Sequence, residues 1–253
     1  AQQVQLNLRQ DRYSDFGTAN TGLLGYGLAF ADNWRATASV SNAFKAPTFN
    51  DMFYPFVDYG FGFSYAGNPN LKPERSRDNE LGLHYANEGQ HLDVVYFDNR
   101  IRNLIVYNNQ ASGTMINLDE ARIDGMELAY NGQFGDTALK LAATRQNSRD
   151  TTTGKILLRR AKQHASLALT QRAGAWEASG ELRHSGARQD ADINTFAPVT
   201  LPGYQVINLN ARYQMDNNLS AVVRVDNLLN KDYMLVHGYS NAGRTVFVGL
   251  NYR

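Results

Sequence analysis

The sequence predicts an all-β fold, an antiparallel transmembrane β-barrel with about twelve strands present. Apolar and polar residues alternate with period two along most of the chain, which is typical of strands with two chemically different faces. Short turns alternate with long polar loops, the asymmetry of an outer-membrane barrel. No apolar run approaches the roughly 18 residues that a membrane helix needs. Together these observations favour strands, not helices, as the membrane-crossing elements.

The strands are identified by their alternation. Near the start, apolar Val4, Leu6 and Leu8 alternate with polar neighbours, and the same pattern recurs through Ile207, Leu209, Ala211 and Tyr213. The predicted strands cover residues 3–14, 22–31, 34–46, 76–87, 91–107, 122–133, 137–149, 160–172, 175–189, 204–215, 219–235 and 244–253. Most are about ten residues or longer, the length that a tilted strand needs to cross a bilayer.

The connections predict two different rims. Short turns are expected at 32–33, 87–90, 134–136, 173–174 and 216–218, and long loops at 15–21, 47–75, 108–121, 150–159, 190–203 and 236–243. Aromatic residues sit next to the short turns and the C-terminus, where a girdle would meet lipid headgroups: Phe30, Trp34, Tyr85, Tyr130, Trp176, Tyr213 and Tyr252. A soluble β-sandwich, the alternative for a two-faced β protein, would instead collect aromatics in its core.

The composition excludes several function classes. A formal charge of +1 argues against a nucleic-acid binder, which usually carries a basic excess. The absence of cysteine removes disulfides, zinc-thiolate sites and thiol nucleophiles. Four histidines, His84, His91, His164 and His184, fall on separate strands without metal-ligand spacing, so no metal site and no cofactor are expected.

Three motifs go beyond the fold class. They are Ser41-Asn42-Ala43-Phe44-Lys45-Ala46-Pro47-Thr48-Phe49 with Gly67-Asn68-Pro69-Asn70-Leu71-Lys72-Pro73-Glu74-Arg75-Ser76, then Leu157-Leu158-Arg159-Arg160-Ala161-Lys162, and then Val225-Asp226-Asn227-Leu228-Leu229-Asn230-Lys231-Asp232-Tyr233 running into Gly238-Tyr239 and Ala242-Gly243-Arg244. Their order and spacing resemble the C-terminal half of TonB-dependent outer-membrane receptors, over essentially all 253 residues. The second motif and the ending favour the cobalamin-receptor branch of that family.

The resemblance implies a receptor in the Gram-negative outer membrane that binds cobalamin or a related corrinoid at extracellular loops. In this family a plug closes the barrel and contacts TonB, and no plug sequence is present here, so TonB would act only through a segment outside residues 1–253. These residues are expected to form a single β-barrel domain that is part of a larger barrel, in contact with membrane lipid and lipopolysaccharide. The calcium-binding loops of the family belong to the other half, which again predicts no metal.

The resemblance also implies substrate contacts. The first Arg of Leu-Leu-Arg-Arg is Arg159, whose guanidinium can donate hydrogen bonds to corrinoid amides or phosphate, or else be solvated or paired with a loop carboxylate. A family tyrosine contact falls on or near Ile193, and Phe196 offers an aromatic face in its place. The aromatic-rich loop 48–65 contributes Tyr54 and Tyr59, which suit a large, flat ligand unless the loop packs upon itself.

Other functions stay open. The shared motifs also fit a siderophore or haem receptor fragment, and a smaller closed barrel would form a passive pore. An outer-membrane phospholipase also has twelve strands, and His237 and Ser240 would be its base and nucleophile. No carboxylate that could orient His237 is obvious in the sequence, so we expect no catalytic residues and no enzyme.

Overall fold

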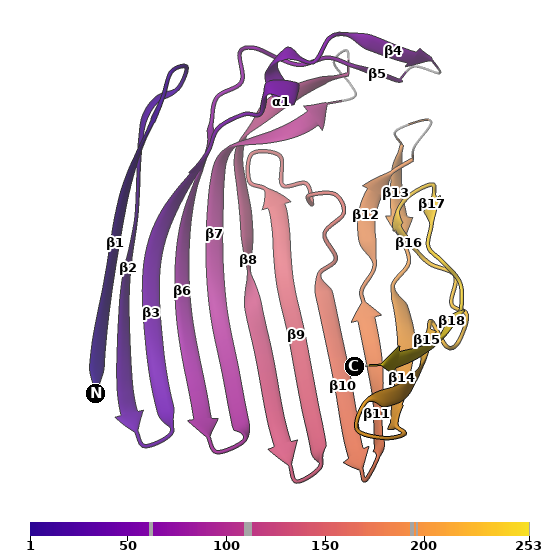
Figure 1. The fold of residues 1–253 in the computed structure, drawn as a ribbon. Coiled ribbons are helices and arrows are strands. Elements are labelled where there is room, and N and C mark those ends of the chain that lie inside the picture. The colour runs from indigo at the N-terminus through magenta and orange to yellow at the C-terminus, as the bar shows by residue number, and fades with distance from the viewer. Residues whose placement is uncertain (61–62, 109–112, 193–194, 196, 253) are drawn as a thin grey trace.

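A computed structural model describes the chain except for residues 61–62, 109–112, 193–194, 196 and 253. One antiparallel sheet of twelve strands dominates it, in the order β1-β2-β3-β6-β7-β8-β9-β10-β11-β14-β15-β18 (Figure 1). Strands that are adjacent in the sheet are also consecutive in the sequence, if the short strands within the long connections are not counted. The all-β prediction is therefore confirmed, with twelve long strands in a meander.

Each of the twelve strands overlaps one of the twelve predicted segments, although several bounds differ. Their bounds are β1 Gln2–Tyr13, β2 Gly17–Ala31, β3 Trp34–Lys45, β6 Glu74–Asn87, β7 Gln90–Asn108, β8 Thr114–Phe134, β9 Thr137–Asp150, β10 Gln163–Ala173, β11 Trp176–Ser185, β14 Tyr204–Gln214, β15 Leu219–Asp226 and β18 Thr245–Tyr252. The start of β8 was predicted at 122. Because β7 pairs with β8 as far as Asn108 and Thr114, most of the predicted loop 108–121 is strand.

The prediction that a strand runs from 219 to 235 is wrong beyond Asp226. Asn227 and Asn230 both adopt the left-handed backbone conformation, with φ of 51°, which ends the extended chain. The buried side chain of Asn227 accepts a hydrogen bond from the backbone N–H of Lys231 at 2.8 Å and donates to its carbonyl at 2.9 Å. Asparagine tolerates this conformation and bonds locally, so a turn replaces the strand.

The ladders place apolar side chains of neighbouring strands on one face of the sheet. Leu6 lies opposite Leu24, and Leu24 lies opposite Val40. Many side chains of this face are exposed: Leu8 is 80% exposed and Val248 70%. The buried hydrophobic cluster of Leu104, Ala121 and Leu157 lies instead where β7 and β8 approach the loop after β9. The sheet therefore presents a broad apolar face, called the apolar face below, and its other face is mostly polar.

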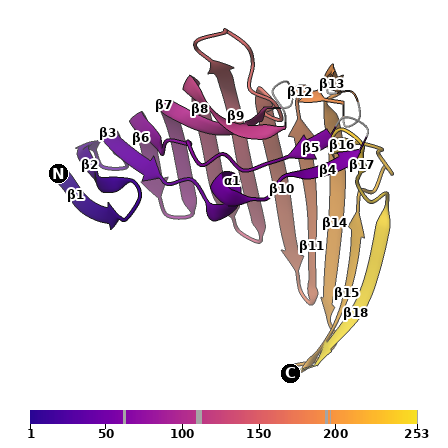
Figure 2. The same ribbon diagram turned by 90° about the horizontal axis from the view of Figure 1, so that it is seen from above.

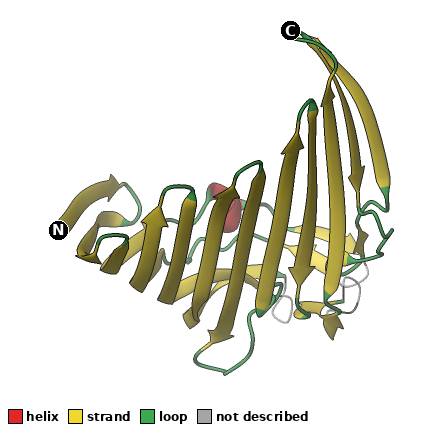
Figure 3. Ribbon diagram, turned by 90° about the horizontal axis from the view of Figure 1, so that it is seen from below, coloured by secondary structure: helices red, strands yellow, loops and turns green. Residues whose placement is uncertain are grey.

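The sheet does not close on itself. Strands β1 and β18 form its two edges, and within the described residues neither pairs with the other (Figures 1 and 3). Seen from above, the strands follow an open arc with the two termini at opposite ends (Figure 2). A barrel's diameter grows with its strand number, and strands that follow a gentle arc cannot close in a small ring. The strands predicted for a barrel thus form an open, curved sheet within the described residues, and the smaller closed ring considered for a passive pore is not formed by them.

The connections at the two ends of the sheet differ in length. At one end, turns occupy 32–33, 88–89, 135–136, 174–175 and 215–218, while at the other the connections are 14–16, 46–73, 109–113, 151–162, 186–203 and 227–244. The connection 14–16 is short, although a longer loop was expected at 15–21, because β2 already begins at Gly17. No helix in the described part of the chain is long and apolar enough to span a membrane.

The long connections carry small elements of their own. They are α1 Phe49–Phe53, β4 Val57–Gly60, β5 Phe63–Tyr65, β12 Arg188–Ala191, β13 Pro198–Leu201, β16 Met234–Val236 and β17 Tyr239–Ser240. Thr48 caps α1, because its hydroxyl accepts from the backbone N–H of Asp51 while the Asp51 carboxylate accepts from that of Thr48. Elements α1, β4 and β5 lie across the end of the sheet where the long connections gather (Figures 1 and 2).

The aromatic residues predicted at the short-turn end pair across neighbouring strands. Trp34 lies opposite Tyr85 with ring centroids 5.0 Å apart, and Trp176 opposite Tyr213 at 4.6 Å. Both pairs lie on the apolar face next to short turns: Trp34 and Trp176 are the first residues of β3 and β11, and Tyr85 and Tyr213 lie within two residues of the ends of β6 and β14. Rings in this position suit the boundary between lipid tails and headgroups.

Candidate ligand-binding loops

Three long connections meet at the carboxylate of Asp190. Asp190 lies in β12, and its side chain is fully buried. One oxygen accepts from Nε of Arg159 at 2.9 Å and from the backbone N–H of Ala191 at 2.8 Å, while the other accepts from the backbone N–H of His237 at 2.8 Å. Residues 151–162, 186–203 and 227–244 are therefore joined at one charged group, which we call the Asp190 junction.

The backbone conformation of Arg159 positions its side chain next to Asp190. Arg159 has a left-handed φ of 62°, uncommon for a residue with a long side chain. Its N–H donates to the carbonyl of Gln189 at 2.7 Å, next to Asp190, so the chain after β9 is fastened to β12. Left-handed backbone persists only where the surroundings enforce it, and such positions gather at functional sites.

The guanidinium of Arg159 stays accessible despite its ion pair. The side chain is 56% exposed, and the bond to Asp190 uses Nε–H, one of five guanidinium donors. The sequence left open whether Arg159 is solvated or paired with a loop carboxylate, and in the structure it pairs with the loop carboxylate of Asp190. A positioned, half-exposed guanidinium can donate hydrogen bonds to amide or phosphate oxygens of a ligand.

The surroundings of Asp190 favour its charged form. Burial alone would raise the pKa of this carboxyl, but hydrogen bonds from His237 N–H, Arg159 and Ala191 N–H outweigh burial and lower the pKa below its ordinary value. The junction therefore keeps its negative charge at neutral pH, and Arg159 keeps its partner.

The expectation that His237 has no nearby carboxylate is wrong. Nδ1 of His237 lies 3.6 Å from an Asp192 carboxylate oxygen, two residues after the carboxylate that binds the His237 backbone. The two carboxylates of Asp190-Ala191-Asp192 were visible in the sequence, but their proximity to His237 was not. Ser240 lies in β17 opposite Met234, and its side chain makes no hydrogen bond within the described residues. The arrangement of a nucleophile bonded to its base is thus not assembled.

The aromatic loop contains a group of tyrosines in contact with one another. Tyr54 contacts Tyr65 edge to face with centroids 5.1 Å apart, and Tyr65 stacks on Tyr107 of β7 at 6.0 Å. A hydrogen bond between Tyr59 and Tyr54 raises the pKa of Tyr59. The loop therefore packs partly upon itself, which was the alternative to ligand binding considered for its aromatic residues. It nevertheless leaves Tyr59 53% and Phe49 83% exposed.

Three of the five predicted contact residues lie in two separate groups of the structure, and the other two are not described by it. Tyr54 and Tyr59 belong to the tyrosine group, and Arg159 belongs to the Asp190 junction. Ile193 and Phe196 lie outside the described residues. In the part of the chain that the structure describes, no group of three or more His, Asp and Glu side chains gathers as a metal site would.

The fold and the long connections together indicate the class of protein to which this chain belongs. Long antiparallel strands, an exposed apolar face and rings at the short-turn end are features of outer-membrane β-barrel proteins. A family model described as TonB dependent receptor-like, beta-barrel, matches residues 3–228. The chain therefore belongs to the TonB-dependent receptor β-barrel family, whose members lie in the outer membrane of Gram-negative bacteria.

Relatives in sequence are named as vitamin B12 transporters. BtuB of Vibrio vulnificus is 32% identical over 258 residues, and BtuB of Photobacterium profundum is 28% identical over 257. Each match covers 99% of this chain and 40% of the relative. The chain thus spans two fifths of the length of these relatives.

Similar solved structures include receptors for other cargo. The ferric enterobactin receptor of Pseudomonas aeruginosa, solved in complex with enterobactin, superimposes with a TM-score of 0.82 at 20% identity, covering 99% of this chain and 43% of that one. The copper transporter OprC gives a TM-score of 0.75 at 21% identity, covering 93% and 40%. These likenesses show the fold, since the same arc of strands occurs in receptors of different cargo.

Proposed function

We propose that this chain is part of an outer-membrane receptor that binds cobalamin or a related corrinoid at its long connections for TonB-dependent uptake. The observation that carries the proposal is the half-exposed Arg159 guanidinium, held by the buried Asp190 at the meeting point of three long connections. The vitamin B12 transporters at 28–32% identity over 99% of this chain support the choice of cargo.

Each predicted contact has a role in the proposal. Arg159 donates hydrogen bonds to peripheral amides or the phosphate of the corrinoid. Tyr54 and Tyr59 offer aromatic surface to the flat macrocycle, since rings give contact area at little conformational cost. Ile193 and Phe196, in the same connection as Asp190, would add apolar contact to the same ligand.

The remaining roles follow from the family. Residues 1–253 form one β-barrel domain within a larger receptor barrel, whose plug links cargo release to TonB. Binding, not bond-making, is the activity, because the named relatives and structural neighbours are transporters and receptors.

A second cargo is supported by the structural neighbours. Ferric enterobactin and copper are named for proteins with the same fold, and exposed rings such as Phe49 would also suit a catecholate siderophore. Equilibrium dialysis of the purified protein in detergent, with cyanocobalamin and ferric enterobactin in parallel, separates the two. The proposal expects cyanocobalamin to be retained, and retention of ferric enterobactin alone would contradict it.

Variants test the role of Arg159. Arg159→Gln removes a charged donor and is expected to weaken cyanocobalamin binding roughly tenfold or more, because a hydrogen bond to a charged group contributes about 1.5–3 kcal/mol. Arg160→Gln makes the same charge change at the next residue and should leave binding unchanged. Asp190→Asn keeps the guanidinium but loosens its position, so a smaller loss than in Arg159→Gln distinguishes contact from scaffolding. Equal binding by the Arg159 and Arg160 variants would refute the role.

A further inference from the structure

A threonine, a histidine and an aspartate form a chain of hydrogen bonds on the polar face of the sheet. Nε2 of His84 in β6 lies 2.8 Å from Oγ1 of Thr37 in β3, and Nδ1 of His84 lies 2.6 Å from a carboxylate oxygen of Asp93 in β7. When Asp93 is ionised and His84 is neutral, Nδ1–H donates to the carboxylate and Nε2 accepts from the Thr37 hydroxyl. A hydroxyl bonded to an imidazole that a carboxylate orients is the arrangement of an activated nucleophile.

The registers of three neighbouring strands bring these groups together. His84 lies directly opposite Asp93, and Thr37 lies opposite Gly82, two residues before His84. Residues two apart on a strand share a face, so Thr37 and His84 are diagonal neighbours across β3 and β6. The three side chains therefore meet only in the folded sheet.

The glycine at position 82 makes the contact possible. A Cβ at this position would lie 2.5 Å from Nε2 of His84 and closer still to Oγ1 of Thr37. Any side chain at Gly82 would therefore force the hydroxyl and the imidazole to move. On the other side of Thr37, a Cβ on Gly27 would make ordinary contacts, the nearest at 3.8 Å to Cγ2 of Thr37.

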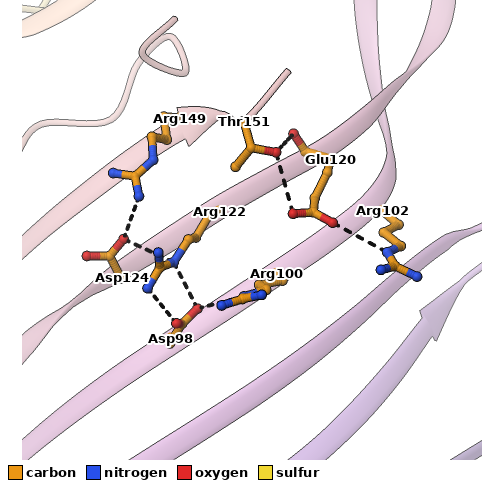
Figure 4. A network of polar contacts seen from close by, with 8 residues as sticks. All are labelled: Asp98, Arg100, Arg102, Glu120, Arg122, Asp124, Arg149 and Thr151. Carbon is orange, nitrogen blue, oxygen red and sulfur yellow. Dashed lines mark hydrogen bonds and ion pairs between the residues drawn. The ribbon is translucent and has the colours of Figure 1, made fainter. Parts of the chain in front are cut away.

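A second threonine illustrates a hydroxyl contact that only supports the fold. The Thr151 hydroxyl donates to the backbone carbonyl of Glu120 at 3.1 Å, next to a group of ion pairs (Figure 4). A backbone carbonyl does not take up a hydroxyl proton, so this contact fastens a connection without activating the oxygen. Thr37 differs from Thr151 because its acceptor is a base.

A cleft of about 580 Å³ lies beside the histidine, at the short-turn end of the sheet. Its lining includes His84, Asp93, Arg35 and Asn131. The side chain of His84 is 20% exposed and that of Asp93 47% exposed, so a small molecule in the cleft can reach them. Arg35 lies opposite His84, and its guanidinium can donate to a carbonyl oxygen on which negative charge develops.

We propose that Thr37 is a nucleophile activated by His84, and that it accepts the acyl group of a carboxylic ester. Oγ1 of Thr37 forms a bond to the carbonyl carbon while its proton passes to Nε2 of His84. The bond from the carbonyl carbon to the alcohol oxygen breaks, and His84 gives the proton to the departing alcohol. Asp93 holds the imidazole in position and stabilises its charged form during the transfer.

The product is a chain that carries one acyl ester on Thr37. The reaction modifies the protein itself and involves no oxidant or reductant. The site lies at the opposite end of the sheet from the Asp190 junction, so it does not depend on the proposed cargo.

The test treats the purified protein in detergent with para-nitrophenyl acetate and locates acetyl groups by peptide mass spectrometry. Trypsin cleavage after Arg35 and Lys45 gives one peptide that contains Thr37 together with Ser39 and Ser41. These serines share the polar face with Thr37 but have no imidazole within hydrogen-bonding distance among the described residues. Thr37 should be acetylated about a hundredfold faster than either serine, since a general base contributes about 10²–10⁴-fold. Equal rates at the three hydroxyl groups would overturn the proposal.

Two glycine variants test the contact between the hydroxyl and the imidazole. Gly82→Ala separates the two groups and should slow acetylation of Thr37 by about a hundredfold. The control Gly27→Ala adds the same methyl group on the other side of Thr37 without a clash, and it should react as the parent does. Equal rates in the two variants would overturn the proposal.

A third variant decides the question if circular dichroism shows that Gly82→Ala does not fold. His84→Gln removes the base without adding bulk next to Thr37, and it should also slow acetylation by about a hundredfold. An unchanged rate in His84→Gln would overturn the proposal.

Discussion

Replacing Asp190 by alanine tests whether one buried carboxylate holds the long connections together. The variant removes the acceptor that binds the backbone N–H of His237 at 2.8 Å and Nε of Arg159 at 2.9 Å. A hydrogen bond to a charged group contributes about 1.5–3 kcal/mol. The Arg159 contact adds less than about 1 kcal/mol, because that side chain is 56% exposed and screened by water. Because the His237 contact is the one that reaches residues 227–244, local opening of these residues should become easier by roughly 1.5–3 kcal/mol.

Hydrogen exchange followed by mass spectrometry measures this opening directly. In Asp190→Ala, peptides covering β16 and β17 should lose protection by about 10- to 150-fold, since 1.4 kcal/mol corresponds to a factor of ten. Peptides from β2 and β3 should exchange as in the parent. The control Asp226→Ala removes a 44% exposed carboxylate that pairs with Arg224 at 3.1 Å, and it should leave β16 and β17 unchanged. A loss of less than twofold in Asp190→Ala would refute the junction.

Three other predictions concern the junction, the turn after β15 and the aromatic end. Because the folded pKa of Asp190 is lowered, its stabilisation is fully present above the unfolded carboxyl pKa of about 3.9 and is lost as pH falls through the lower folded value. A spin label on Leu235→Cys should therefore keep its mobility from pH 7 to about 4 and gain it only below, and a gain between pH 7 and 5 would contradict this. Asn227→Ala should be less stable in urea than Asn227→Gly by about 1 kcal/mol, because only alanine strains the left-handed backbone at φ 51°; equal stability would remove the strain argument. The fluorescence of Trp34 and Trp176, the two tryptophans of the chain, should be quenched more by lipids brominated near the headgroup than by lipids brominated at mid-chain. Stronger quenching by the mid-chain lipids would contradict the placement of these rings at the headgroup boundary.

The sequence predicted the strands because their pattern is local. Alternating faces and turn residues are read within ten or so neighbours, and all twelve predicted segments match strands. The end of β15 was missed because it depends on the Asn227 side chain, which bonds back to Lys231 instead of continuing the strand. Closure of the sheet is likewise not a local property, and the alternating pattern reads the same in an open arc as in a closed ring.

The candidate site was predictable only in part for the same reason. Arg159 was found through a motif, but its partner Asp190 is 31 residues away, and the backbone of His237 is 47 residues beyond Asp190. Nothing in the sequence distinguishes Asp190 from other loop carboxylates until the three connections are brought together.

A structure of the protein determined with cyanocobalamin bound tests the central claim most directly. The account predicts corrinoid density at the end of the sheet that bears the long connections, with a corrinoid oxygen within hydrogen-bonding distance of the Arg159 guanidinium and rings of the 46–73 connection against the macrocycle. Density elsewhere on the sheet, or a ligand that leaves Arg159 in contact with Asp190 and water alone, would contradict it.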